Sequence, residues 1–504
     1  MLATFMEVLD TSVANVALPH IAGSLSATPE EATWVLTSYL VANAIILPMG
    51  AWFSMLVGRK RFYMICVTLF TVSSLLCGLA PSLGLLILFR VLQGLGGGAL
   101  QPVSQAIMRE SFPANKQGIA MAFYGMGVVV APIIGPTLGG WITDNYTWHW
   151  IFLINIPIGA LSLLLTSALV YDPPYLQRMK LSEGAKIDYI GFGLLTTGLG
   201  FLEIALDEGQ RKDWFSSNLI VGATVIGIFS LISVVLWELR QKNPVVDFRL
   251  LKERNFAIST LNMFALGFVL YGSTAALPLF LQSLLGYTAT QSGMVLSPGG
   301  MVVMAFMPIV GMLVAKVQPR WLVMFGLIML SSGLYIMTHW NLQIAFGNAV
   351  QARMVQSVGL AFLFVPINAI AFNFIAKERI SYATGIINLA RNFGGSTGIA
   401  MVTTMLARRM QYHQSVLVAN LTPYDPAYQA ALSGNAATLQ QHGLGAAQAG
   451  RAAQAMLYGM VQKQSSMLAY IDIFWMMAII SLALIPLLFL MKNIHTHTGE
   501  IHVE

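Results

Sequence analysis

The chain has 504 residues, of which 56% are hydrophobic and only 10% are charged, and its mean hydropathy is +0.70. Soluble domains carry about 25% charged residues and disordered chains are poor in apolar and aromatic residues, so this composition excludes both classes. The net charge of +6 is attributed to the topology of membrane loops and not to affinity for nucleic acid. A membrane-spanning helix needs about 20 apolar residues, so this length can hold well over ten of them. We therefore expect an all-α polytopic membrane protein.

Hydrophobic runs long enough to cross a bilayer occur fourteen times along the chain. The first run lacks a leading basic region and a small-residue cleavage site, so we interpret it as a span and not as a cleaved signal peptide. The expected spans cover residues 1–24, 33–54, 62–80, 84–108, 118–142, 149–170, 188–207, 215–238, 256–284, 290–315, 320–339, 343–375, 382–407 and 470–491.

Lys and Arg residues are distributed unequally between the loops that these spans define. Of the 27, 18 fall in loops on one side of the membrane, six fall on the other side, and three lie within spans. Loops rich in Lys and Arg stay in the cytoplasm, so the distribution predicts that both termini are cytoplasmic. The three within spans are Arg90, Arg353 and Arg391.

A faint internal repeat relates the two ends of the chain. Arg90-Val-Leu-Gln93 in the fourth span recurs 263 residues later as Arg353-Met-Val-Gln356 in the twelfth. The same separation carries the first span onto the ninth, which indicates parallel repeats with a substrate cavity between them, and hence a transporter. We expect residues 1–170 to form an N-terminal six-helix bundle, 171–255 two inserted helices with cytoplasmic linkers, and 256–504 a C-terminal six-helix bundle.

Residues 408–469 form a long polar segment on the outer side. The segment is rich in Ala and Gln, which favour helix, and is interrupted by several glycines. We expect one or two amphipathic helices outside the membrane, which serve either to dock a partner or as a solvated cap. Asp472 follows directly and is expected at the N-terminus of the last span.

Two acidic residues of the first span, Glu7 and Asp10, lie three apart and so share a helix face. Burying a charge in hydrocarbon costs several kcal/mol, which makes each a candidate for function. Arg90 is the expected partner and cannot lose its charge. A proton and a cationic or lipophilic drug would then compete for one carboxylate, with Asp10 favoured over Glu7. The alternative is a static Asp10–Arg90 pair that locks the first span to the fourth.

Other ionisable residues inside the spans have more than one interpretation. Arg353 is either a cavity group or an anchor that reaches the interface. Arg391, one turn after Asn388, either lines the cavity or bonds backbone carbonyls. Glu203 and Asp207 share a face at the outer end of the first inserted helix, where we expect them to reach the membrane interface.

The fifth span carries small residues every four positions and two prolines. Small residues at this spacing let another helix approach closely, and proline removes a backbone hydrogen bond and permits a bend. The pattern predicts either tight packing or a bendable seal between the two halves. The residues concerned are Gly127, Ala131, Pro132, Gly135, Pro136, Gly139 and Gly140.

Patterns typical of soluble enzymes occur only in unsuitable settings. Gly94-x-Gly96-x-x-Ala99 and Gly394-x-Ser396-x-Gly398 both lie inside spans, and the chain has no phosphate loop with Gly-Lys-Ser/Thr. His495, His497 and His502 are interpreted as part of a flexible tail and not as a metal site. We expect no enzyme activity, no metal and no cofactor.

These motifs together resemble the major facilitator superfamily, specifically its fourteen-helix drug:proton antiporters of the EmrB/QacA type, over essentially the whole chain. The stretch from Leu9-Asp10 through Asn15 to Pro19 is similar to the first-helix motif of that family. Arg90-x-x-Gln93-Gly94 is similar to its fourth-helix motif, whose arginine is implicated in proton coupling. The run ending Gly135-Pro136-x-x-Gly139-Gly140 resembles the motif of exporters, and residues 237–256 resemble the linker into the second half.

The loop between the second and third spans departs from the family pattern. Ala51, Met55 and Leu56 stand at its usual glycine, acid and arginine positions, whereas the basic run Gly58-Arg59-Lys60 remains. We therefore expect the turn and its positive charges without the charge relay of the family.

The resemblance implies proton-driven export of hydrophobic or amphipathic toxic compounds, drugs or fatty acids, with a proton gradient in place of a cofactor. It also implies a multi-pass protein of a bacterial inner membrane, with a periplasmic adaptor and an outer-membrane channel as partners and residues 408–469 as their candidate contact. Two alternatives stay open, a proton-coupled importer of a small solute and a non-transporting membrane sensor. An importer of charged nutrients should need fixed charges in both halves, and the second half offers only Arg353 and Arg391.

Overall fold

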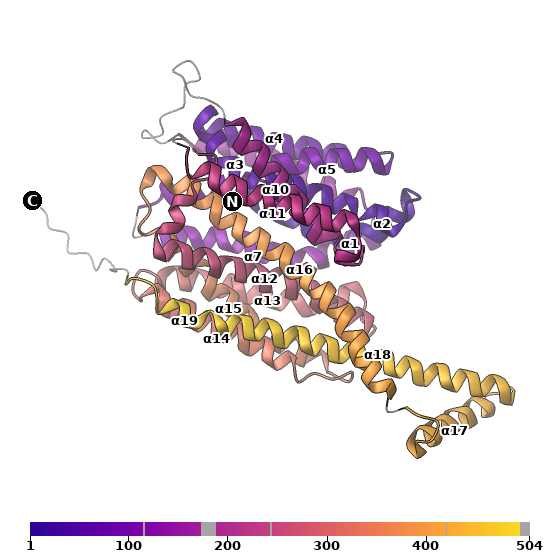
Figure 1. Ribbon diagram of the computed structural model, residues 1–504. Coiled ribbons are helices and arrows are strands. Elements are labelled where there is room, and N and C mark those ends of the chain that lie inside the picture. The colour runs from indigo at the N-terminus through magenta and orange to yellow at the C-terminus, as the bar shows by residue number, and fades with distance from the viewer. Residues whose placement is uncertain (114–115, 173–187, 242–243, 420, 494–504) are drawn as a thin grey trace, which may run out of the picture.

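The computed structural model describes residues 1–113, 116–172, 188–241, 244–419 and 421–493, and within them every regular element is a helix (Figure 1). Twelve helical runs are long and apolar enough to cross a membrane. Two further helices, α1 (Leu2–Ser24) and α16 (Ile380–Ala419), pack lengthwise among them and complete the fourteen spans expected. The chain is therefore an all-α, multi-pass membrane protein.

The helices follow the expected order of six, two and six. The first group, in addition to α1, comprises α2 (Pro29–Ala32), α3 (Trp34–Val57), α4 (Arg59–Gly78), α5 (Leu83–Gly97), α6 (Leu100–Ser111), α7 (Gln117–Asn145), α8 (Trp150–Leu153) and α9 (Asn155–Leu169). The inserted pair comprises α10 (Tyr189–Glu208) and α11 (Asn218–Glu238). The last group, in addition to α16, comprises α12 (Arg254–Ser283), α13 (Ala289–Leu313), α14 (Pro319–Met337), α15 (Phe346–Phe372), α17 (Pro426–Gln441), α18 (Ala446–Ala483) and α19 (Ile485–Leu488).

The same capping device opens the second span of each half. Thr28 accepts a hydrogen bond from the backbone N–H of Glu31, whose carboxylate accepts one from the Thr28 N–H at 2.9 Å. Thr288 and Gln291 repeat the arrangement at the start of α13. Each box satisfies two backbone donors that a helix start leaves unpaired. The shared device agrees with the internal repeat of the sequence.

Two spans expected as single helices are broken. The span at 84–108 divides into α5 and α6 at Gly98 and Ala99, where glycine favours helix poorly and α3 approaches closely. The span at 149–170 divides into α8 and α9 at Ile154. Pro157 explains this second break, because its ring clashes with the carbonyl four residues earlier.

The expected polar segment 408–469 is mostly a continuation of two spans. Helix α16 runs on to Ala419 and α18 starts at Ala446, so only α17 is a separate helix. Figure 1 shows α17 and the adjoining ends of α16 and α18 projecting from one end of the bundle. Both helices extend beyond the expected spans, because the Ala- and Gln-rich flanks favour helix and continue it past the apolar run.

Side-chain contacts join several of the loops expected on the basic side. Arg59 donates to Ser381 at 2.9 Å, Arg379 pairs with Asp247 at 3.4 Å, and Lys492 pairs with Glu253 at 3.8 Å. Loops far apart in the sequence therefore meet at one end of the molecule, as the assignment of Lys and Arg residues requires.

The two halves meet along two main seams. Helix α7 packs along α13, while α3 and α6 pack against α16. The inserted helix α10 lies against both α3 and α16, and so bridges this second seam. Any movement of one half relative to the other must therefore break or rearrange these contacts.

Close packing of α5 on α4 gives the first prediction. A Cβ at Gly96 would lie 2.6 Å from the backbone nitrogen of Phe70, whereas a Cβ at Gly84, on the same helix, would meet nothing within 4 Å. Gly96→Ala should therefore destabilise the fold by about 1–3 kcal/mol through overpacking. Gly84→Ala is the matched control and should unfold at the temperature of the unmodified protein in a thermal-unfolding assay. Equal melting temperatures for the two variants would contradict this packing.

Candidate functional site

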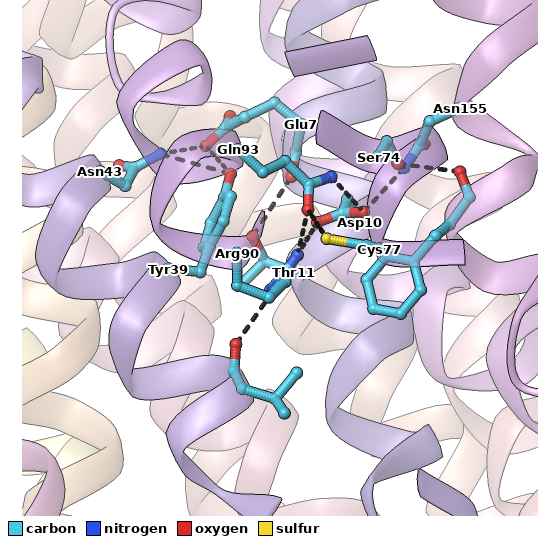
Figure 2. Close-up of polar contacts among 12 residues, drawn as sticks. Glu7, Asp10, Thr11, Tyr39, Asn43, Ser74, Cys77, Arg90, Gln93 and Asn155 are labelled. Atoms are coloured by element: carbon cyan, nitrogen blue, oxygen red, sulfur yellow. Dashed lines mark hydrogen bonds and ion pairs between the residues drawn. The ribbon is translucent and has the colours of Figure 1, made fainter. Parts of the chain in front are cut away.

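A buried ion pair joins the first span to the fourth (Figure 2). One Nη atom of Arg90 donates to Asp10 at 2.6 Å, and both side chains are almost completely buried. Asp10 also accepts from the Gln93 amide at 3.0 Å and the Asn155 amide at 2.7 Å. Helices α1, α5 and α9 are thereby tied together at one carboxylate.

The guanidinium of Arg90 is enclosed on its other sides. Its Nε donates to the backbone carbonyl of Val35 at 2.9 Å, and the same Nη atom that contacts Asp10 donates to the Gln93 side-chain oxygen at 2.9 Å. The ring of Tyr39 lies 4.2 Å from its central carbon, at a distance that favours a cation–π interaction. Arg90 thus has a charged partner, polar acceptors and an aromatic face.

Glu7 lies on the same helix but has different partners. Its carboxylate accepts hydrogen bonds from the Asn43 amide at 2.9 Å, the Tyr39 hydroxyl at 3.3 Å and the Gln101 amide. The side chain is 3% exposed, and among the described residues no Lys, Arg or His forms an ion pair with it. Arg90 is therefore the ion-pair partner of Asp10, as expected. Glu7 instead accepts hydrogen bonds from neutral donors.

Gln101 connects Glu7 to the second half. Its side-chain oxygen accepts a hydrogen bond from the guanidinium of Arg391 on α16, while its amide donates to Glu7. One turn later, Gln105 accepts from Asn388 at 2.5 Å and donates to Asn368 of α15 at 2.6 Å. A row of buried amides on α6 therefore crosses the boundary between the halves.

Sequence reasoning found Asn388 and Arg391 but missed most of this row. Gln101 and Gln105 are four residues apart on one face of an otherwise apolar helix, and Asn368 is a lone amide in a hydrophobic run. Buried amides must be hydrogen-bonded, so their spacing was a usable signal. Tyr39, Asn43 and Asn155, which also bind the two carboxylates, were not predicted either, because neutral polar residues carry no formal charge that marks them in an apolar span.

Arg353 lies apart from this network, at the junction of α15 and α12. It donates to Gln356 at 2.6 Å and to the hydroxyls of Ser273 and Thr274 at 3.3 Å each. The side chain is fully buried. It is therefore not an anchor at the membrane interface, which was one of its two expected roles.

The row of small residues in α7 faces α1. A Cβ at Gly135 would lie 2.5 Å from the Cβ of Ser12, and one at Gly139 would lie 3.0 Å from Val13; at Gly127 the neighbour is Phe5 at 3.6 Å. The contact of α7 with α13 uses other positions, such as Gly118 against Gly311. The row therefore provides tight packing within the first half.

Both prolines of the fifth span, Pro132 and Pro136, lie inside the unbroken helix α7. The carbonyl that Pro136 leaves without its usual helical donor belongs to Pro132, and the Ser12 hydroxyl of α1 donates to it at 3.2 Å. Gly140 is buried and its carbonyl accepts from Thr143 at 3.0 Å. Asn15 on α1 is exposed and lies outside the buried network.

The loop between α3 and α4 fastens the two halves at the basic end. Gly58 has a φ of 95°, which glycine adopts without strain, and this turn aims Arg59 inward. Arg59 is 4% exposed, forms an ion pair with Glu110 of α6 and donates to Ser381 of α16. Lys60 instead reaches the Ser167 carbonyl within the first half.

The inserted hairpin fastens the halves nearer the opposite end. Glu203 accepts from Ser396 of α16, Asp207 accepts from Thr37 of α3, and Trp214 donates to Thr404 of α16 at 3.0 Å. The expectation that Glu203 reaches the membrane interface was wrong, because its side chain is 3% exposed. Hydropathy places a residue along a helix but does not reveal that two neighbouring helices cover it.

Asp472 was also misplaced in the sequence analysis. It lies in the interior of α18, where the Nε of Arg409 donates to it at 2.5 Å and a ring nitrogen of His413 lies 2.7 Å away. Both partners belong to the extended part of α16. The Arg409–Asp472 ion pair and the His413 contact therefore hold the two long helices together where the apolar run gives way to polar sequence.

The contacts of Arg59 lead to a prediction about the seam where α3 and α6 pack against α16. Arg59→Gln removes the ion pair with Glu110 and should raise the chemical accessibility of a cysteine placed at the buried position Thr384 by about tenfold, since breaking a buried pair costs several kcal/mol. Maleimide labelling in membranes measures this accessibility, because the native Cys66 and Cys77 are both buried. Arg61, which is exposed, supplies the control Arg61→Gln and should leave labelling unchanged. Equal labelling rates in both variants would refute the role of Arg59.

The chain matches the model of the Major Facilitator Superfamily over residues 1–399. It is 38% identical over 493 residues to the multidrug export protein EmrB of Escherichia coli K12, covering 97% of this chain and 94% of that protein. It is 36% identical over 496 residues to the fatty acid resistance protein FarB of Neisseria gonorrhoeae, with the same coverage. Among solved structures, the proton:xylose symporter XylE is similar in fold, with a TM-score of 0.57 and 15% identity over 97% of this chain and 98% of that chain.

The order of helices, the two related halves and these similarities agree. The chain belongs to the major facilitator superfamily and is a membrane transporter, not an enzyme.

Proposed function

We propose that the protein is a proton-driven exporter of hydrophobic and amphipathic toxic compounds, drugs or fatty acids. The observation that carries the proposal is the environment of Glu7, a buried carboxylate at the boundary between the halves that is bound by neutral donors. The names of the relatives, a multidrug export protein and a fatty acid resistance protein, agree with such substrates.

Glu7 and Asp10 differ in what protonation would cost. Protonating Asp10 would leave the buried Arg90 without its charged partner, which is strongly unfavourable. Protonating Glu7 would break no direct ion pair, because the nearby Arg391 is joined to it only through the Gln101 amide. We therefore assign proton exchange to Glu7, and to the Asp10–Arg90 pair the task of holding α1 in place on α5.

Exchange follows from competition at one carboxylate. Ionised Glu7 attracts a lipophilic cation or the polar end of an amphipath, and protonated Glu7 releases it. Because Gln101 contacts both Glu7 and Arg391, a change at Glu7 alters a hydrogen bond that crosses between the halves. A proton that moves down a potential of 100 mV supplies about 2.3 kcal/mol for this cycle.

The location and partners complete the proposal. Basic residues gathered at one end of the bundle support a bacterial inner membrane protein with both termini in the cytoplasm. The projecting helices α16, α17 and α18 then face the periplasm and are the candidate contact for an adaptor that leads to an outer-membrane channel.

Substitution of Glu7 tests the assignment. Inverted membrane vesicles that contain Glu7→Gln should show no proton release when a lipophilic cationic dye is added, whereas vesicles with the unmodified protein should release protons. The melting temperature of Glu7→Gln should equal or exceed that of the unmodified protein, since a buried charge that forms no direct ion pair has been removed. A pH-sensitive fluorophore reports the release, and thermal unfolding reports the stability.

Asp10→Asn gives the contrasting prediction. This variant leaves Arg90 without its acidic partner and should lose about 3–5 kcal/mol of stability, visible as a clearly lower melting temperature. Full dye-dependent proton release in Glu7→Gln together with its loss in a stable Asp10→Asn protein would reverse the two assignments. Absence of release in the unmodified protein with a broad panel of dyes would instead favour the importer or the sensor.

A further inference from the structure

The second half contains a counterpart of the Asp10–Arg90 pair that lacks the acid. Arg353 and Gln356 on α15 repeat Arg90 and Gln93 on α5, and in both cases a guanidinium Nη donates to the glutamine oxygen, at 2.6 Å and 2.9 Å. In each half the first long helix, α1 or α12, supplies the next hydrogen-bond partner of the arginine. In the first half that partner is Asp10, and in the second it is Ser273, whose hydroxyl lies 3.3 Å from Arg353.

The difference leaves a positive charge without a negative one. The separation of 263 residues between the two arginines also separates Asp10 from Ser273. Arg353 is 0% exposed, and among the described residues no Asp or Glu forms an ion pair with it. A buried guanidinium that contacts only hydroxyls and one amide remains uncompensated, which is an unfavourable state unless an anion comes to it.

Three buried donors around Arg353 have no acceptor among the described residues. They are the Nε of Arg353, the side-chain amide nitrogen of Gln356 and the hydroxyl of Ser357. In the first half the corresponding amide of Gln93 donates to Asp10, so the amide of Gln356 lacks the very acceptor that a carboxylate would supply. Buried donors in proteins are nearly always satisfied, so a group of three in one place requires an explanation.

Two of these donors border the same residue of α13. A Cβ at Gly299 would lie 2.5 Å from the Ser357 hydroxyl and 3.4 Å from the Arg353 Nε. Gly299 has no side chain to cover them, yet its backbone closes the site in this conformation. Access for an anion would require α13 to move away from α15, which is a motion between two helices of the same half.

We propose that Arg353, Gln356 and Ser357 bind the carboxylate of an amphipathic anion when α13 separates from α15. A guanidinium offers planar, paired N–H donors that match the two oxygens of a carboxylate, and the amide and hydroxyl donors complete its shell. The anion neutralises Arg353 as Asp10 neutralises Arg90. Insofar as the anion is a compound that the protein exports, this inference rests on the proposed function, and it assigns acidic amphipaths to a site separate from Glu7.

The Asp10–Arg90 pair of the first half suggests a test, because an acid can be placed at the corresponding position of the second half, Ser273. Ser273→Asp places a carboxylate beside Arg353 and should displace an external anion. Ser273→Asn is the matched control, because asparagine is nearly the same size as aspartate and has no charge. The probe is octanoate, titrated calorimetrically into the full-length protein in lipid nanodiscs, with octanol as the uncharged control. Octanoate should bind the unmodified protein and Ser273→Asn more tightly than octanol does, and should bind Ser273→Asp at least about tenfold more weakly.

The outcomes separate this inference from the proton assignment. The titration needs no proton gradient, and Glu7→Gln should bind octanoate normally even where it has lost proton exchange. Ser273→Asp should also melt at a higher temperature than Ser273→Asn, because it gives Arg353 an ion pair. Equal octanoate affinity in the two Ser273 variants, or equal affinity for octanol and octanoate, would overturn the site. Acetate that binds as tightly as octanoate would overturn its assignment to amphipaths.

Discussion

The cost of burying charge in a bilayer explains the arrangement of the polar residues in this transporter. Four of the ionisable groups buried in the bundle are in three different states. Asp10 and Arg90 neutralise each other, Glu7 has only neutral hydrogen-bond donors, and Arg353 has only neutral partners. A neutralised pair serves structure, because disturbing it exposes a charge to hydrocarbon. An uncompensated charge is suited to function, because its free energy changes greatly when a proton or a ligand binds.

Glu7 and Arg353, which form no direct ion pair among the described residues, have opposite signs and lie in opposite halves. Glu7 in the first half suits a proton or a lipophilic cation, and Arg353 in the second suits an acid. The two halves are joined by the amide row of α6, by Arg59 at the basic end and by the hairpin helix α10 along the α3–α16 seam. This division offers one physical route by which a single bundle can accept amphipaths of either charge.

Much of this architecture could be read from the sequence. Hydrophobic runs located the fourteen spans, and the repeated Arg-x-x-Gln motif paired the two halves, because both signals depend on local composition and spacing. The Asp10–Arg90 pair was also expected, since a buried acid needs a cation. The partners of Glu7 and the burial of Glu203 were not expected, because they depend on helices that come from distant parts of the chain. The ends of α16 and α18 were missed because a helix can outlast its apolar run.

In the transport cycle that we propose, Glu7 exchanges its proton for substrate while Asp10 stays paired with Arg90. The most direct measurement is the number of protons released when a lipophilic cation such as tetraphenylphosphonium binds the purified protein in weakly buffered solution. Proton exchange at Glu7 predicts about one proton released per bound cation for the unmodified protein and none for Glu7→Gln. Release of a full proton by Glu7→Gln on binding the cation would contradict it.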